Sequence, residues 1–301
     1  MAIKNFMNLT EDQARNHLEK VRWPHGPNCP HCGDLEVAKL KGKATRPGLY
    51  KCKGPKCRKQ FTVTVGSIFE GSHIPLSKWI AAFYLVCCSK KGISALQLQR
   101  MLDLKSYKSA WHLAHRIRWA MRHQPFSTLL LQGTVEVDET WVGPRRRKPN
   151  HSNDWQANKT AVVALIERKG DMRTQVYCKV TKENLRSALT ECVDKRAVLM
   201  TDELQAYKKI THDYKDHQTV NHTDKEYARG SAHVNTAESF FALLKRGIHG
   251  SFHHVSKHHL HRYCDEFSFR WNYRGVSDDE RTMAALIATT GKRLTYKTTA
   301  S

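Results

Sequence analysis

The stretch Val135-Glu136-Val137-Asp138 decides the fold class, because its apolar and polar side chains alternate and it ends on an aspartate. Alternation with a period of two is typical of a half-buried strand. The patterning downstream predicts further regular elements: strands at 161–166 and 173–180 joined by a turn at 169–171, a helix from Thr181 to about Val193, a short strand at 197–200, and a helical stretch from Asn235 towards Trp271. This order predicts a mixed α/β domain over residues 130–275.

Two aspartates stand in the same context in this domain. Asp138 and Asp202 each lie at or just past the end of a short apolar strand, where a side chain leaves the sheet and faces a cleft. Glu238 lies early in the last predicted helix, and Lys245 follows seven positions later on the same helical face. Mg²⁺ prefers oxygen ligands, and a pair of ions can activate one oxygen and stabilise another. We therefore expect Asp138, Asp202 and Glu238 to form a two-metal phosphoryl-transfer site for Mg²⁺ or Mn²⁺, with Lys245 beside a phosphate.

Other acids and histidines in the domain are weaker candidates. Glu136 and Glu139 flank Asp138, and Glu203 follows Asp202, so we expect them to support the site or to be solvated rather than to contact metal. A group of histidines lies among basic and polar residues, which favours a DNA-facing or solvated surface over a second metal site. Its members are His249, His253, His254, His258, His259 and His261.

Four of the nine cysteines have the spacing of a metal site. Cys29 and Cys32 form one tight pair followed by Gly33, and Cys52 and Cys57 form a second, looser pair. Zn²⁺ prefers four tetrahedral ligands, which two such pairs on neighbouring hairpin turns can supply. The spacing predicts a structural zinc ribbon, with His31 inside the first pair as a competing ligand that we expect to point outwards. The remaining cysteines are expected in the core: Cys87, Cys88, Cys178, Cys192 and Cys264.

Positive charge is concentrated in the stretch between the cysteine pairs and Asp138. The chain carries 50 Lys and Arg against 28 Asp and Glu, a net charge of +22, and residues 76–130 hold nine basic side chains against the single acid Asp103. Such a stretch is the electrostatic footprint of a phosphate-binding surface. The alternative is a basic, well-solvated face with no specific partner.

Residues 94–122 are typical of a helix-turn-helix, with a short helix, a break at 103–105 and a longer basic helix. In that geometry the second helix enters the major groove of DNA, where its first residues meet base edges and later ones meet phosphates. The expected base readers are Ser106, Tyr107, Lys108 and His112. The expected phosphate contacts are Arg116, Arg118 and Arg122, with Arg145, Arg146, Arg147 and Lys148 in a basic loop over the active site, and Arg246. A solvated charge run is the alternative for the loop.

Targeting signals are not evident in the sequence. No segment approaches the roughly 20 apolar residues that span a bilayer, and the N-terminus lacks a charged-then-apolar signal pattern. Together with the metal-type cysteines, this predicts a protein of a reducing cytoplasm that does not bind membranes.

The chain resembles the DDE transposases of bacterial insertion sequences, in particular the group with an N-terminal zinc ribbon. The resemblance covers about residues 20–275. It rests on the ribbon running into 60–64, on 137–140, on Thr201-Asp202, on 233–238, on 244–247, and on 263–267 followed by 270–272. The second cysteine pair is longer than the usual spacing of the group. Members also vary at the third acidic position, so Asn235 is an additional candidate metal ligand, although a role in orienting a ligand or water is favoured.

The resemblance implies a ribonuclease-H-like catalytic domain that cuts and joins DNA at the terminal inverted repeats of its own element. It also implies target DNA as a partner, a homodimer or larger synaptic complex, and association with the bacterial nucleoid. We expect four parts: a helix and zinc ribbon at 1–74, the helix-turn-helix at 75–125, the catalytic domain at 130–275 and a C-terminal tail at 276–301.

Three other functions remain open at this point. The chain could be a DNA-binding regulator with an inactive nuclease, although all three acids and Lys245 are present. It could be a nuclease of the same fold that hydrolyses strands without joining them, since both reactions use one site. A zinc-ribbon module for RNA or protein is disfavoured, because it would not need the three acids.

Overall fold

The computed structural model describes residues 6–122, 129–144, 159–202, 207, 212–219 and 233–295. The chain divides into two units. One contains Met1–Met121 together with Val276–Ser301, and the other is Arg122–Gly275. Within the described residues, no helix combines the length and the apolar character needed to cross a bilayer.

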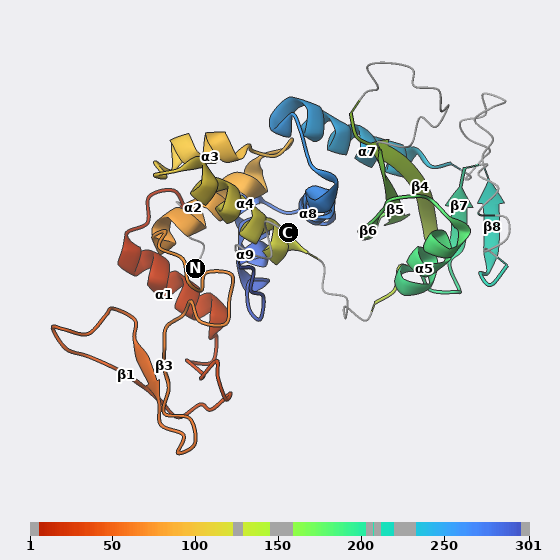
Figure 1. The fold of residues 1–301 in the computed structure, drawn as a ribbon. Coiled ribbons are helices and arrows are strands. Elements are labelled where there is room, and N and C mark those ends of the chain that lie inside the picture. Colours follow the sequence, from red (N-terminus) through yellow and green to blue (C-terminus); the bar gives the residue numbers. More distant parts are fainter. Residues whose placement is uncertain are drawn as a thin grey trace. The chain divides into compact units, whose positions relative to one another are not determined.

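The second unit is built on a five-stranded mixed sheet (Figure 1). Its strands are β4 (Thr134–Val142), β5 (Thr160–Glu167), β6 (Met172–Tyr177), β7 (Val198–Thr201) and β8 (Asp216–Thr219), in the order β6-β5-β4-β7-β8. β4, β5 and β6 are antiparallel neighbours, whereas β7 runs parallel to β4 and β8 runs parallel to β7. A hairpin followed by parallel strands on the other side of the first strand is the ribonuclease-H-like arrangement, so the predicted fold class is confirmed.

Helices cover both faces of this sheet. On one face, Leu185 and Leu189 of α5 (Lys182–Cys192) pack against Val135 and Val137 of β4. On the other face, α7 (Asn235–Gly247) and α8 (Leu260–Asn272) pack against β5. The sequence predicted one helical stretch here, which is wrong in detail: the chain leaves the α-helix at the short η1 (Ile248–Phe252), reaches a positive φ of 60° at His253, and passes through η2 (Lys257–His259) into α8.

The first unit begins with α1 (Glu11–Arg22) and a small antiparallel sheet of β1 (Val37–Lys39), β2 (Tyr50–Cys52) and β3 (Gln60–Phe61). Thr10 and Gln13 form a capping box at the start of α1. Trp23 packs edge-on against Tyr50 and Phe61, and this aromatic group is the apolar core of a region that otherwise has few large side chains. β3 is short, because the chain turns after Phe61.

Four helices complete this unit: α2 (Leu76–Cys88), α3 (Ala95–Met101), α4 (Tyr107–Met121) and α9 (Asp278–Ile287). α3 and α4 are the predicted helix pair, and the break between them includes Asp103 at a φ of 46°. Residues 276–301, which the sequence analysis set apart as a tail, contain α9, and a capping box of Ser277 and Glu280 fixes its first turn.

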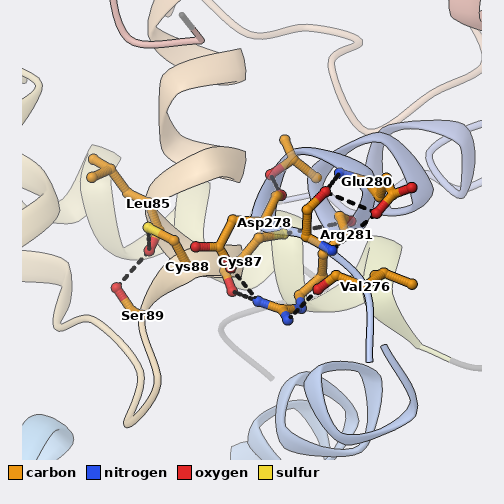
Figure 2. A network of polar contacts seen from close by, with 10 residues as sticks. Leu85, Cys87, Cys88, Ser89, Val276, Asp278, Glu280 and Arg281 are labelled. Carbon is orange, nitrogen blue, oxygen red and sulfur yellow. Dashed lines mark hydrogen bonds and ion pairs between the residues drawn. The ribbon is translucent and has the colours of Figure 1, made fainter. Parts of the chain in front are cut away.

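An arginine on α9 ties this C-terminal helix to α2 (Figure 2). The guanidinium of Arg281 donates to the carbonyl of Cys87 at 3.1 Å and to that of Val276 at 3.2 Å, and it is paired with Asp278. Residues nearly 200 positions apart therefore belong to one helical unit. The second unit is therefore inserted in the chain between α4 and α9.

Candidate functional site

Asp138 and Asp202 lie at the same level on two adjacent parallel strands. The last residues paired between β4 and β7 are Val137 and Thr201, and each aspartate is the next residue along. The expectation that Asp138 ends its strand is wrong. β4 continues to Val142, paired with β5 alone. The two aspartates therefore lie where β7 ends beside the longer strand β4.

Three carboxylates converge at this point. Oxygen atoms of Asp138, Glu139 and Asp202 all lie within 4.8 Å of one another. Burial is the main cause that raises the pKa of Asp138 to about 7. The charges of Asp202 and Glu238 also raise it, whereas the N–H of Glu139 and the cation of Lys245 lower it. Burial likewise raises the pKa of Glu139 to about 8, with Asp202 adding to the shift.

Glu139 was expected to be a supporting or solvated residue, yet the structure brings it into the carboxylate group. It is 8% exposed, and the hydroxyl of the fully buried Tyr207 donates to its Oε2 at 2.7 Å. Strand alternation points Glu139 to the opposite face of the sheet from Asp138. The sequence offered no signal for its closeness to Asp202, because that closeness depends on where β7 ends.

Glu238 and Lys245 lie on α7, which covers the face of the sheet that carries Asp138. Both side chains are exposed, and both charges reach Asp138 closely enough to shift its pKa in opposite directions. Glu238 is not part of the tight group of carboxylates in the described part of the chain. Asn235 is the first residue of α7 and is exposed.

Glu136 was expected to support the site or to be solvated, and its burial excludes the solvated alternative. It is fully buried on β4 and accepts hydrogen bonds from the backbone N–H groups of Thr236 and Ala237 at the start of α7. The guanidinium of Arg168 pairs with it at 2.8 Å. A strand residue therefore holds the helix that carries Glu238.

The donor set of this site fits a hard divalent cation. Carboxylate oxygens are the ligands that Mg²⁺ and Mn²⁺ prefer. Grouping half-buried and buried carboxylates is costly without a compensating positive charge, and the raised pKa values of Asp138 and Glu139 express that cost. Asp138, Asp202 and Glu238 could hold such ions, and Glu139 lies within reach of the same position.

The four cysteines of the ribbon also converge. Their Sγ atoms all lie within 4.8 Å of one another, with Cys29 and Cys57 separated by 3.7 Å and Cys32 and Cys52 by 3.6 Å. Zn–S bonds of about 2.3 Å in a tetrahedron give sulfur–sulfur edges of about 3.8 Å, whereas a disulfide would be about 2 Å long. The cysteines are unbridged, so the set fits Zn²⁺.

A glycine lies in each of the two cysteine turns. Gly33 has a φ of 80° and donates its N–H to the carbonyl of Cys29 at 2.8 Å, which closes the first turn. A Cβ at Gly54 would lie 2.4 Å from the Asp34 carboxylate and 3.3 Å from the Sγ of Cys52, so a side chain there would have to displace that carboxylate and would press on the Cys52 sulfur. His31 is exposed and lies outside the sulfur group, as expected.

The predicted DNA-contacting residues fall into three classes. Exposed or half-buried positions on or near α4 are Ser106, Tyr107, Lys108, His112 and Arg122, and Arg246 is exposed near the end of α7. Arg116 and Arg118 are 4% and 2% exposed. Arg145, Arg146, Arg147 and Lys148 lie outside the described residues, as does Glu203.

The expectation that Arg116 contacts a phosphate needs correction. Its guanidinium donates to the carbonyl of Glu70 at 2.7 Å and lies 5.2 Å from the ring centroid of Trp79. Burial lowers its pKa to about 10. This guanidinium therefore packs inside the helical unit and does not face solvent. Arg118 is also buried, so it too is not an exposed phosphate contact.

Comparisons with known proteins identify the family of the chain. Residues 130–272 match the family described as "ISXO2-like transposase domain", and residues 9–60 match "Transposase zinc-ribbon domain". The chain is 30% identical over 285 residues to an "Uncharacterized protein in transposable element ISH50" of Halobacterium salinarum, which covers 90% of this chain and 93% of that protein.

Two solved structures also match. The Mos1 strand transfer complex shares 12% identity over 66% of this chain and 77% of that chain, with a TM-score of 0.25. A pre-cleavage Mos1 transpososome shares 13% identity over 90% of this chain and 93% of that chain, with a TM-score of 0.22.

Proposed function

Because this chain belongs to the ISXO2-like family of insertion-element transposases, we propose that it binds the terminal inverted repeats of its own element and cuts and joins DNA there with two divalent metal ions. The observation that carries the proposal is the convergence of Asp138 and Asp202 at the end of the β4–β7 pairing, with Glu238 on the helix that covers them.

Each acid has a separate task in this proposal. The charges of both Asp202 and Glu238 act on Asp138, so Asp138 is the residue that would help to hold both ions. Asp202 and Glu238 would each complete the ligand shell of one ion. When bound, Mg²⁺ or Mn²⁺ would activate the attacking oxygen and stabilise the leaving oxygen of the phosphodiester.

The other residues of the site bind and orient. The exposed ammonium group of Lys245 lies on the same side as Asp138 and is suited to hold a phosphate of the strand to be cut. Tyr207 fixes the Glu139 carboxylate by its hydrogen bond. The nucleophile would be water in the cutting step and a 3′ hydroxyl in the joining step, and one site serves both.

Specific DNA binding would reside in the helical unit. Tyr107 is 53% exposed and Lys108 is exposed, so the start of α4 presents side chains that can reach base edges. The net charge of +22 supplies the attraction to phosphates. Two or more copies of the chain would hold the two element ends, and the target duplex would be the further DNA partner. A structural zinc ion on Cys29, Cys32, Cys52 and Cys57 would stabilise the ribbon.

The test is a reaction of the full chain with labelled terminal-repeat DNA in Mg²⁺ or Mn²⁺, with and without a supercoiled target. We expect cutting at the repeat and joining of its 3′ end to the target. A scrambled repeat of equal length is the control substrate, and Glu183→Gln, which removes an exposed acid on α5, is the control protein. Hydrolysis without joining would identify a nuclease, and repeat binding without cutting would identify a DNA-binding regulator.

A further inference from the structure

Both oxygens of the Glu136 carboxylate accept hydrogen bonds, from the first turn of α7 and from Arg168. Its Oε2 accepts from the N–H of Thr236 at 2.9 Å and from the N–H of Ala237 at 3.2 Å. Its Oε1 accepts from the hydroxyl of Thr236 at 2.9 Å and from Nε of Arg168 at 2.8 Å. The Nδ1 of His233 lies 3.3 Å from the same oxygen. Glu136 itself is fully buried.

These bonds replace a cap that α7 lacks. The residue before the helix is Val234, whose side chain cannot accept a hydrogen bond. The first four N–H groups of a helix have no partner within the helix, and they attract negative charge. Thr236 and Ala237 are the second and third residues of α7, so Glu136 satisfies two of these four groups from a neighbouring strand.

The hydrogen bonds of Glu136 also determine which part of β4 the first turn of α7 lies against. Glu136 and Asp138 are two positions apart on β4 and therefore lie on the same face, one repeat of the strand apart. Ala237 directly precedes Glu238 on α7. Anchoring the N–H of Ala237 at Glu136 sets the first turn of α7 against β4 at the level where the charge of Glu238 acts on Asp138.

Arg168 also stabilises the contact between Glu136 and the start of α7. It pairs with Glu136 through Nε, and one of its Nη atoms donates to the carbonyl of His233 at 2.8 Å, so it contacts both the strand residue and the segment that enters α7. This cation offsets the cost of burying the Glu136 charge.

We propose that Glu136 is a positioning residue, which acts through α7 to place the third metal-binding carboxylate, Glu238, against Asp138. The proposal rests on the two-metal function, with Glu238 as a ligand. Glu136 does not contact metal in it. Its role is to fix the position of α7, which carries Glu238, relative to β4, which carries Asp138.

The first measurement needs no metal. Both oxygens of Glu136 face hydrogen-bond donors, so in Glu136→Gln the amide –NH₂ group faces donors whichever way the amide is turned. The N–H groups of Thr236 and Ala237 therefore lose a charged acceptor. Their hydrogen exchange, followed by NMR on the full chain, should become about tenfold faster or more, the equivalent of about 1.4 kcal/mol. Glu183→Gln should leave both rates unchanged. Unchanged rates in Glu136→Gln would overturn the anchor.

The second measurement is the coupling between Glu136 and Glu238 in Mn²⁺ binding, measured by calorimetry on the full chain. Glu136→Gln should weaken Mn²⁺ binding about tenfold in the wild-type background and less than about twofold in the Glu238→Gln background. Equal weakening in both backgrounds would show that Glu136 supports the fold without acting through Glu238, and would overturn the proposal.

A milder variant covers the case in which Glu136→Gln does not fold. Thr236→Val removes only the hydroxyl bond to Oε1 and leaves the backbone anchor. It should weaken Mn²⁺ binding by a few-fold in the wild-type background alone, and the same loss in both backgrounds would contradict the proposal. If the wild-type chain bound no Mn²⁺, the two-metal function and the positioning role would both be wrong, whereas the exchange rates would still show whether the anchor exists.

Discussion

Tyr207 donates a hydrogen bond of 2.7 Å from a fully buried hydroxyl to Oε2 of Glu139, the residue that follows Asp138 on β4. The bond holds a buried carboxylate beside Asp202 and occupies one of its oxygens. Tyr207→Phe should therefore leave a buried acceptor without its donor and lower the free energy of unfolding by about 1–3 kcal/mol. Denaturant unfolding measures this, and Tyr273→Phe, at an exposed position, should change it by less than about 0.5 kcal/mol. An equal loss in both variants would contradict a special role for the Tyr207 bond.

The carboxylate group predicts how stability depends on pH before metal is added. The pKa values of Asp138 and Glu139 rise to about 7 and about 8, so the folded chain binds protons that the unfolded chain has released. This stabilisation is complete below the unfolded pKa near 4 and is lost as pH rises through 7 to 8. Without added divalent metal, the contribution of the site to the melting temperature should fall between pH 5 and pH 8, and Asp138→Asn should reduce the fall.

Added Mg²⁺ should reverse that trend, because the cation takes the place of the protons. The melting temperature at pH 8 should rise with Mg²⁺ in the wild type and not in Asp138→Asn. A melting temperature that responded equally to Mg²⁺ in both proteins would indicate that the ion acts elsewhere.

The zinc ribbon predicts a local effect of losing one cysteine. Metal analysis should find about one zinc per chain, and Cys52→Ser should lose it, because three thiolates bind the ion more weakly than four. Hydrogen exchange should then accelerate in residues 28–65, whereas Mg²⁺ should still raise the melting temperature. Cys178 is exposed, so its expected place in the core is wrong. Because it lies outside the sulfur group, Cys178→Ser should retain the zinc. Protein purified without chelator that contains no zinc would contradict the assignment.

Two of the basic residues of α4, Lys108 and Arg116, predict different consequences for DNA binding. Lys108 is exposed, so Lys108→Ala should weaken binding and relax the preference for the terminal repeat, measured as affinity for repeat and scrambled duplexes. Arg116 is buried against Trp79, so Arg116→Ala should lower the melting temperature and should not change the salt dependence by the roughly one unit expected for a lost phosphate contact. A shallower salt dependence for Arg116→Ala without loss of stability would restore its expected role as a phosphate contact.

The sequence predicted those features that depend on local patterns. Alternation along 135–138 placed Asp138 in a strand, and the spacing of the cysteine pairs predicted the group of four sulfur atoms. In each case, residues close in the sequence determine the structure.

Features that depend on distant residues were not predictable in this way. The closeness of Glu139 to Asp202 depends on β7 being shorter than β4, which no local pattern of β4 reveals. Arg116 looks solvent-facing within a basic helix, and only its packing against Trp79 and the carbonyl of Glu70 shows that it is buried. The return of α9 to α2 joins residues on either side of the inserted catalytic unit.

Asn235 tests which residue supplies the third ligand. It begins α7 and is exposed, one turn before Glu238. Asn235→Ala should retain strand cutting at a reduced rate, because the amide orients a ligand or water, whereas Glu238→Gln should abolish it. The reverse result, with Glu238→Gln active and Asn235→Ala inactive, would show that the third ligand is Asn235.

Strand cutting by the acid variants tests the central claim most directly, that Asp138, Asp202 and Glu238 hold the metal ions for DNA cutting. Asp138→Asn, Asp202→Asn and Glu238→Gln keep the size of each side chain and remove the charge that the ions require. Each variant should bind terminal-repeat DNA with wild-type affinity and cut it at least about a hundredfold more slowly, while Glu183→Gln cuts normally. Cutting at the wild-type rate by all three acid variants would contradict the account.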